Sequence, residues 1–309
     1  ASFSGRPFHP WPLSSFLITE GEEILVVPFP LYHIYAFNIT LLLYFSTGAH
    51  SVLIPNPRDM VGFINSIKTI KFTAISGLNT LFVGLCSLPE FRELDFSQLR
   101  ITTSGGTALT SSTAKLWKEV TGCDICEGYG LSETAPVVTF NLPGQTLIGS
   151  IGSTVPDPEI KLLDESDKEV VPGVAGELAV RGPQVMQGYW RSDNATAEVM
   201  TTDGYFKTGD IAERLDNGYY KIVDRKKDMI IVSGFNVYPN EVEEILSNHA
   251  GIQEAAVIGV PLEKTGEAVK AFIVKSQQNQ DLAEEDVISH CKTFLNAKKI
   301  PKQQSLIHL

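Results

Sequence analysis

Short apolar runs separated by turn residues set the pattern of the first third of the chain. Runs at 24–29, 51–54, 72–76 and 101–104 have the length of buried strands, and proline or glycine follows each of them. After the last run, Thr110 is placed to start a helix that Gly122 would stop. This alternation of strand and helix is typical of an α/β fold.

The longest apolar stretch covers residues 31–45 and contains His33, Asn38 and Thr40. It is shorter than the roughly 20 residues that cross a bilayer as a helix. We therefore expect a buried helix here, in a chain that is soluble or attached to a membrane only peripherally.

The pattern changes near residue 148 and again after Asp224. Between them, frequent turn residues surround short runs at 177–181 and 219–224, which predicts a small β-rich subdomain. After Asp224 we expect an α+β unit with strands at 255–260 and 269–274. It would hold two helices with one apolar face each, the first starting at Pro239 and stopping at Gly251. The residues of these faces are Val242, Ile245, Leu246 and His249, then Val287, Ile288, Cys291 and Leu295.

The charged cluster at 225–228 is the expected domain boundary. The prediction is a partial large domain over residues 1–224, whose α/β sheet is followed by the β-rich subdomain at 148–224. A small, incomplete α+β domain would cover 225–309.

Composition narrows the class of protein. The 309 residues are 43% hydrophobic and 20% charged, and the formal net charge is −11. This balance is ordinary for a globular protein and argues against a nucleic-acid partner, which would call for a basic stripe. Four cysteines are too few for a disulfide scaffold and favour a reducing compartment. Cys123 and Cys126 have zinc or redox spacing, but no second ligand pair lies nearby, so a structural role is favoured.

Residues 127–134 carry the richest candidate chemistry. Two glycines bracket Tyr129, which would let a ligand approach the backbone and stack on the ring. Ser132 offers a hydroxyl to a phosphate, and Glu133 is a hard oxygen ligand suited to Mg²⁺. A strand that ends in a turn with a solvated glutamate explains the same residues without a ligand.

Three weaker candidates lie elsewhere. Gly105 and Gly106, between a strand and a helix, would leave backbone amides free near the helix start for an anion or a purine edge. Asp210 follows a glycine turn and is placed to accept hydrogen bonds from ribose hydroxyls. His33 precedes the apolar stretch and would face an acyl or carboxylate site. Taken alone, each is better explained as a turn, a cap or a core residue.

The motifs in their order resemble the adenylate-forming superfamily of acyl-CoA synthetases, luciferases and peptide-synthetase adenylation domains, and are most similar to bacterial long-chain fatty acid–CoA ligases. The resemblance spans nearly the whole chain. It rests on PLYH at 30–33, PNPRD at 55–59, TSGG at 103–106, EGYGLSETAP at 127–136, GELAVRGPQVMQGYW at 176–190, FKTGD at 206–210 and DRKKDMIIVSGFNVYPNEVE at 224–243.

The resemblance implies a role for each matching position. Tyr129 would stack on adenine, Ser132 would touch the α-phosphate where relatives more often carry Thr, and Asp210 with Arg225 would hold the ribose. The implied nucleotide-binding set is Gly105, Gly106, Thr107, Glu127, Gly128, Tyr129, Gly130, Ser132, Asp210 and Arg225. The other implied roles are Glu133 as Mg²⁺ ligand and catalytic residue, His33 as catalytic residue at the acyl carboxylate, Phe37 as gate of the fatty-acid tunnel, Lys227 as hinge and Gly234 on the coenzyme A path.

The implied reaction joins a fatty acid to coenzyme A through an acyl-adenylate, with ATP and Mg²⁺. The expected partners are these small molecules and no nucleic acid. The expected location is the cytoplasm, and peripheral attachment to the inner membrane and a homodimer both stay open. Two parts of the family pattern, a phosphate-gripping loop and a late lysine, are not found, so we expect a fragment cut at both ends with weak or no activity. The alternatives are another adenylate-forming ligase, for aryl acids or carrier loading, and a non-catalytic nucleotide-binding protein.

Overall fold

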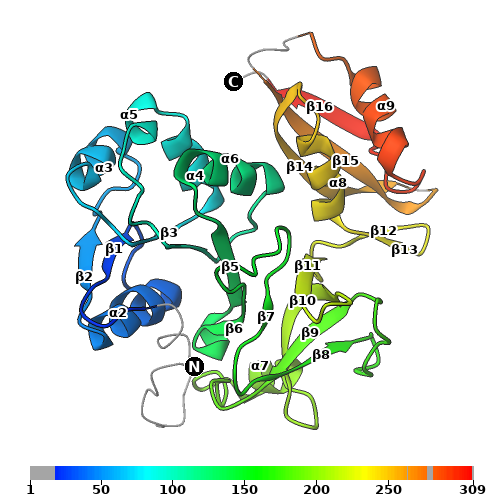
Figure 1. The fold of residues 1–309 in the computed structure, drawn as a ribbon. Coiled ribbons are helices and arrows are strands. Elements are labelled where there is room, and N and C mark those ends of the chain that lie inside the picture. The colour runs from blue at the N-terminus through cyan, green and yellow to red at the C-terminus, as the bar shows by residue number, and fades with distance from the viewer. Residues whose placement is uncertain (1–17, 263, 277–280, 308–309) are drawn as a thin grey trace. The chain divides into compact units, whose positions relative to one another are not determined.

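The computed structural model describes residues 18–262, 264–276 and 281–307, which fall into two compact units (Figure 1). Unit 1 consists of Ala1–Val174, Ala179–Thr208 and Arg214–Lys221. Unit 2 consists of Ala175–Leu178, Gly209–Glu213 and Ile222–Leu309.

A sheet in the order β2-β1-β3-β4-β5-β6-β7 forms the centre of unit 1. Strands β1 to β5 pair in parallel, and β6 and β7 continue the sheet antiparallel. The strands are β1 Ile24–Val27, β2 His50–Leu53, β3 Ala74–Gly77, β4 Ile101–Ser104, β5 Ile125–Gly130, β6 Val137–Phe140 and β7 Ser153–Thr154. All four apolar runs expected as strands are strands, which confirms the α/β prediction.

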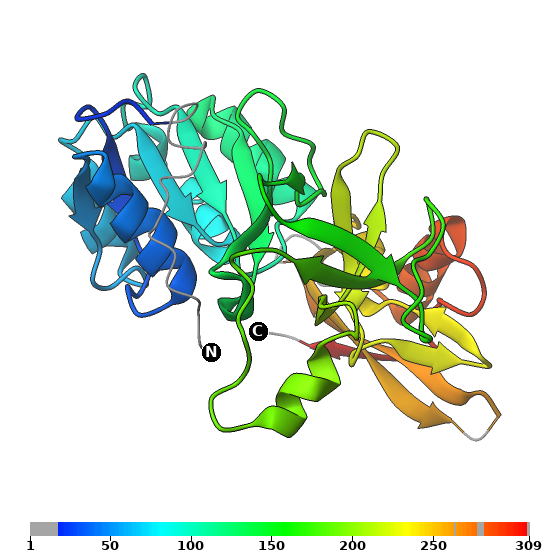
Figure 2. The ribbon, with the colours of Figure 1, turned by 90° about the horizontal axis from the view of Figure 1, so that it is seen from below.

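Helices cover both faces of this sheet (Figure 1). Four lie on one face, and η1 with α2 lies on the other, as Figure 2 shows from that side. The helices are η1 Ala36–Leu43, α2 Tyr44–Ser46, α3 Met60–Ile67, α4 Asn79–Cys86, α5 Pro89–Arg92 and α6 Ser111–Thr121. Local sequence sets the ends of α6 as predicted, because Thr110 caps its first turn and Gly122, at φ +76°, closes its last.

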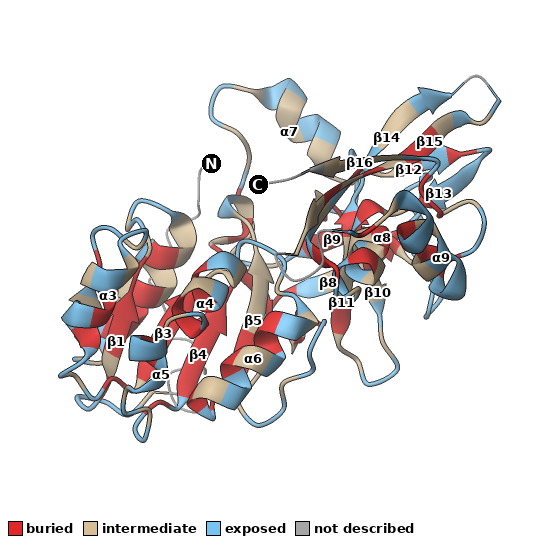
Figure 3. Ribbon diagram, turned by 90° about the horizontal axis from the view of Figure 1, so that it is seen from above, coloured by how far each residue is buried: buried red, intermediate tan, exposed pale blue. Residues whose placement is uncertain are grey.

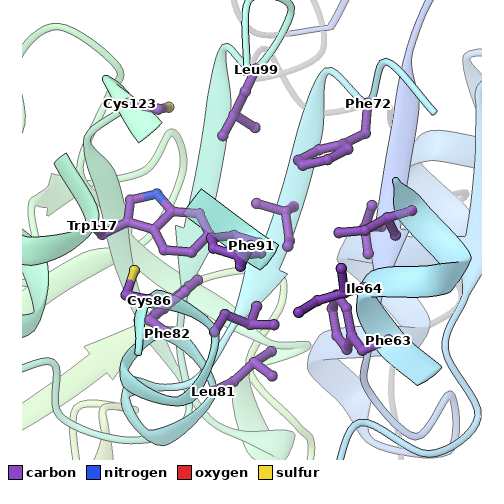
Figure 4. Close-up of a cluster of buried hydrophobic side chains, with 14 of the residues drawn as sticks. Phe63, Ile64, Phe72, Leu81, Phe82, Cys86, Phe91, Leu99, Trp117 and Cys123 are labelled. Carbon is purple, nitrogen blue, oxygen red and sulfur yellow. The ribbon is translucent and has the colours of Figure 1, made fainter. Parts of the chain in front are cut away.

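The larger core lies under the four helices (Figure 4). Trp117 of α6 is fully buried, with its ring centre 4.6 Å from that of Phe82 and 5.6 Å from that of Phe91. Its indole N–H donates to Thr102 of β4 at 3.1 Å, which fixes the helix on the sheet. Figure 3 shows that the strands of this sheet are largely buried, whereas the helices have a buried side toward the sheet and an exposed side toward solvent.

The prediction of a buried helix over 31–45 was wrong in two respects. Residues 31–33 form a turn, and the helix that follows is a π-helix continued by α2. Only Ala36, Thr40, Leu43 and Tyr44 are buried, whereas Phe37 is 43% and Phe45 77% exposed. A helix on the surface of a sheet buries one stripe, however apolar its sequence. Among the described residues, none of the helices combines the length and the apolar character that crossing a membrane requires.

The β-rich region forms a second sheet in the order β11-β10-β9-β8. Its strands are β8 Glu159–Leu163, β9 Gly176–Arg181, β10 Phe206–Arg214 and β11 Tyr220–Arg225. The sequence predicted β9 and β11 but placed a turn inside β10 and missed the short helix α7 Asp193–Val199, which buries no residue. The glycine at position 209, at φ +76°, is accommodated within the strand.

The C-terminal part of unit 2 is the expected α+β arrangement. Its sheet has the order β13-β12-β15-β14, with β16 beside β15, and α8 and α9 pack on it around Leu246 and Cys291. The elements are β12 Ile230–Val232, β13 Phe235–Val237, α8 Pro239–Ser247, β14 Ile252–Leu262, β15 Gly266–Lys275, α9 Glu284–Phe294 and β16 Gln303–Ile307. Gly251 is not the stop of α8, because the N–H groups of Asn248 and His249 already bond to Ile245 and Leu246 and tighten the last turn.

A buried carboxylate joins the amino ends of three central strands of unit 1. Glu23, just before β1, accepts hydrogen bonds from the hydroxyl of Thr73 and the guanidinium of Arg100. It also accepts from the backbone N–H of Thr19 at 2.7 Å. Thr73 precedes β3 and Arg100 precedes β4, so one side chain aligns the starts of β1, β3 and β4.

Replacing Glu23 by alanine is expected to destabilise unit 1. It leaves the Thr73 hydroxyl and a backbone N–H without their acceptor, at a cost of about 2–3 kcal/mol in the free energy of unfolding. Urea denaturation followed by tryptophan fluorescence measures this loss. Glu22→Ala, at the exposed neighbour, is the control, and equal stability of the two variants would contradict the role of Glu23.

Candidate active site

Glycines at the carboxyl ends of β4 and β5 let the backbone pack closely. A Cβ on Gly105 would lie 3.3 Å from the carbonyl oxygen of Gly128 and 3.4 Å from the ring of Tyr35. A Cβ on Gly130 would lie 1.6 Å from the carbonyl oxygen of Pro136, which excludes every other residue there. The glycine pattern around Tyr129 is therefore required by packing, whatever ligand approaches it.

Gly105 and Gly106 lie between a strand and a helix, as the sequence predicted, but they are not close to the helix start. Helix α6 begins at Ser111, and Thr110 caps it by accepting the N–H of Thr113. Residues 105–110 form a loop, so the glycines and Thr107 directly follow β4 instead. Gly106, at φ +90°, turns the chain out of the strand.

Glu133 is held by a tyrosine that the sequence did not single out. It lies in the short helix η2, Ser132–Thr134, and the hydroxyl of Tyr189 donates to its Oε1 at 2.9 Å. The carbonyl of Glu133 also accepts the N–H of Met186 at 2.8 Å. Burial, followed by this hydrogen bond, raises the pKa of Tyr189 to about 12, so the phenol stays a donor. Tyr189 lies in the matched QGYW segment, but no local pattern signals a partner so far along the chain.

Glu127 on β5 carries a half-buried carboxyl. Burial raises its pKa from 4.5 to about 8, although the backbone N–H of Leu109 opposes the shift by hydrogen bonding. At neutral pH the group is mostly protonated and can donate a hydrogen bond as well as accept one. This dual character suits the edge of a nucleobase.

A polar row crosses β3 and β4 beneath the start of η1. The hydroxyl of Tyr35 lies 2.8 Å from that of Thr103, which lies 2.7 Å from that of Ser76. Burial raises the pKa of Tyr35. Tyr35 lies in the sequence between the two predicted acyl-site residues, His33 and Phe37, and was not itself among the predicted residues. His33 is exposed, and its Nδ1 accepts the N–H of Tyr35 at 3.3 Å.

Asp210 and Arg225 form a pair within unit 2. The Nε of Arg225 lies 3.6 Å from an Oδ of Asp210, which is 9% exposed, and the Arg225 side chain is open to solvent. The expectation that Asp210 follows a turn was wrong, since it lies inside β10. A carboxylate held in a strand beside a guanidinium presents a fixed acceptor to hydroxyl groups.

The remaining predicted positions lie in turns of unit 2. Lys227 is exposed in the turn between β11 and β12. Gly234, at φ +78°, and Ser233, at φ +51°, form the two-residue turn between β12 and β13. Both positive φ values match a type I′ hairpin, which explains a glycine there.

Cys123 and Cys126 are both buried and free. Among the residues that the structure describes, His, Cys, Asp and Glu nowhere gather in a group of three or more that could hold a metal ion.

Comparison with known proteins gives consistent matches. A family model described as AMP-binding enzyme matches residues 9–190, and one described as AMP-binding enzyme C-terminal domain matches 241–307. A long-chain-fatty-acid–CoA ligase of Salmonella typhimurium (strain LT2) is 47% identical over 288 residues, which is 93% of this chain and 51% of that protein. The chain spans about half the length of the curated relatives it matches.

Two solved structures share the fold over nearly the whole chain. ATP-bound MatB from Rhodopseudomonas palustris superimposes with a TM-score of 0.87 at 29% identity, covering 96% of this chain and 58% of that one. The anthranilate CoA ligase AuaEII in complex with anthranoyl-AMP superimposes with a TM-score of 0.85 at 29% identity and the same coverage.

The protonated state of Glu127 is expected to make stability depend on pH. Because the folded chain holds this proton more tightly than the unfolded chain does, its contribution to stability is complete below about pH 4.5 and is lost as the pH rises through about 8. Glutamine does not titrate, so the stability of the unsubstituted chain relative to Glu127→Gln should fall across this window. Urea denaturation from about pH 5 to about pH 9 measures the difference.

Glu119→Gln, which removes an exposed carboxyl from α6, is the matched control. A difference between the chain and Glu127→Gln that stays constant over this pH range would contradict the raised pKa.

Proposed function

The chain belongs to the AMP-binding enzyme family, and on that premise we propose that it is part of an ATP-dependent long-chain fatty acid–CoA ligase. The observation that carries the proposal is the 47% identity, continuous over 93% of the chain, to a ligase of that class. The residues at and after the carboxyl end of β5 support the proposal. They are Tyr129 with its aromatic ring, Glu127 with a mostly protonated carboxyl, and Glu133, whose carboxylate accepts a hydrogen bond from Tyr189.

The proposed reaction has two steps. A carboxylate oxygen of the fatty acid attacks the α-phosphorus of ATP, and pyrophosphate leaves. The thiolate of coenzyme A then attacks the carbonyl carbon of the acyl-adenylate, and AMP leaves with the electron pair of the broken C–O bond. The first step turns oxide, a poor leaving group, into AMP, a good one.

Unit 1 supplies the proposed contacts to base and phosphate. Tyr129 would stack on adenine, with Gly105, Gly106 and Thr107 along the base. The mostly protonated Glu127 would bond to its edge. Ser132, exposed at the start of η2, would donate to the α-phosphate. Gly128 and Gly130 let the backbone on either side of Tyr129 pack against Phe140 and Pro136.

The residues present fit a magnesium ion held jointly with substrate. Mg²⁺ usually takes one or two carboxylates and completes its shell with water and phosphate oxygens. Glu133 supplies one such carboxylate, and the hydrogen bond from Tyr189 restricts its orientation. When bound, Mg²⁺ would neutralise charge on the phosphates.

The other positions serve the remaining substrates. In unit 2, Asp210 and Arg225 would hold the ribose, Lys227 would be the hinge and Gly234 would lie on the coenzyme A path. In unit 1, His33 would line the acyl-carboxylate site, and the partly exposed Phe37 would gate the fatty-acid tunnel. We propose a cytoplasmic enzyme with peripheral contact to the inner membrane, because long-chain fatty acids partition into bilayers.

The proposal predicts that the chain binds a non-hydrolysable palmitoyl-adenylate analogue in the presence of Mg²⁺. Tyr129→Ala should weaken this binding by roughly 5- to 150-fold, since stacking of a base on an aromatic ring is worth about 1–3 kcal/mol. Asp210→Ala should also weaken it. Isothermal titration calorimetry measures all three affinities.

Tyr32→Ala, at a tyrosine that is 92% exposed, is the matched control and should bind like the unsubstituted chain. An aryl-adenylate analogue tests the substrate class. Tighter binding of the aryl than of the palmitoyl analogue would contradict a long-chain substrate, and binding unchanged by Tyr129→Ala would contradict the adenine site.

A further inference from the structure

A second buried carboxylate lies on β9, in the segment of unit 2 next to the Asp210–Arg225 pair. Glu177 is 6% exposed, and its carboxylate makes two contacts. Oε1 accepts the backbone N–H of Gly209 at 3.2 Å, and Oε2 lies 2.6 Å from the ammonium of Lys226. Glu177 has no role in the proposed reaction.

The two partners of Glu177 bracket the pair in the sequence. Gly209 directly precedes Asp210, and Lys226 directly follows Arg225. The backbone N–H of Lys226 also donates to the carbonyl of Gly209 at 2.9 Å, so β10 and β11 are joined at this point. One carboxylate on β9 therefore contacts β10, its neighbour in the sheet, and the residue that follows β11, next to both members of the pair.

The contacts of Glu177 lie at two irregular points of the backbone. Gly209, at φ +76°, interrupts the regular strand just before Asp210, and Lys226 begins a turn just after Arg225. A glycine in a strand and a strand end are both positions where the backbone moves easily. A buried carboxylate that contacts both points restricts this movement next to the Asp210–Arg225 pair.

We propose that Glu177 is a positioning residue for the ribose site. Its carboxylate holds Gly209 and Lys226, and through them sets the direction of the Asp210 and Arg225 side chains toward a vicinal diol. This inference rests on the proposed function, which assigns the ribose to that pair. Glu177 would not touch the ligand itself, and its effect would be confined to the binding of the ribose.

The test compares AMP with 2′,3′-dideoxy-AMP as probes for the whole chain. The ratio of the two affinities reports the hydroxyl contacts and is insensitive to the fraction of folded protein, because both probes share base and phosphate. The unsubstituted chain should prefer AMP by roughly tenfold, as expected for hydrogen bonds to charged groups. Glu177→Gln should reduce this preference to about twofold while leaving the affinity for dideoxy-AMP within about twofold.

Glu159→Gln is the matched control. Glu159 on β8 forms an ion pair with Arg181 on β9, and this pair includes neither Gly209 nor Lys226. It should keep the preference of the unsubstituted chain. If Glu177→Gln does not fold, Lys226→Gln carries the test, because it removes the ammonium contact and should lower the preference in the same direction.

The outcomes separate the two proposals. An unsubstituted chain that does not prefer AMP overturns the ribose site and the inference built on it. A preference in the unsubstituted chain that the folded Glu177 and Lys226 variants retain in full overturns the inference alone. Amide hydrogen exchange at Gly209 and Lys226 gives a second readout, and it should be faster in Glu177→Gln but not in Glu159→Gln.

Discussion

The sheet of unit 1 depends on a carboxylate that is buried where its central strands begin. Glu23 accepts hydrogen bonds from residues that directly precede β3 and β4 while itself preceding β1. Parallel strands have no hairpin to set their relative start, so register must come from contacts between distant segments. Strand β5 pairs in parallel with β4, so the carboxyl ends of these two strands lie side by side, and Gly105 lies against Gly128 there. The proposed adenine site depends on the register of this pair.

Two buried carboxylates and one half-buried carboxyl show how the same group takes different roles in different surroundings. Glu23 and Glu177 each have a cationic partner and one backbone donor, and each holds strands together. Glu127 has a single backbone donor, so its pKa rises to about 8 and it becomes a neutral group. Burying a charge is tolerated when it is paired and hydrogen-bonded, and otherwise the group keeps its proton. A cationic partner therefore distinguishes the structural carboxylates of Glu23 and Glu177 from the candidate binding carboxyl of Glu127.

The candidate chemistry is divided between the two units. Unit 1 carries the ring of Tyr129, the carboxyl of Glu127 and the held carboxylate of Glu133, and unit 2 carries the Asp210–Arg225 pair and the exposed turn at Lys227. In each unit a further residue contacts the candidate residues or their neighbours: Tyr189 donates to Glu133, and Glu177 contacts Lys226 beside the Asp210–Arg225 pair. Such support is what fixes a site to the accuracy that chemistry needs.

The sequence determined the features that depend on neighbours along the chain. It specified the first four strands, both ends of α6 and the α+β character of the last part, because strand length, Thr110 and Gly122 act locally. Its motifs, matched in order, also led to the family. It failed where distant packing decides: the 31–45 segment became a half-exposed π-helix, Asp210 lay within a strand, and α8 ended early. Only the tertiary structure revealed Tyr35, Tyr189, Glu23 and Glu177, since each acts through a partner dozens of residues away, and no periodicity or spacing in the sequence encodes such a contact.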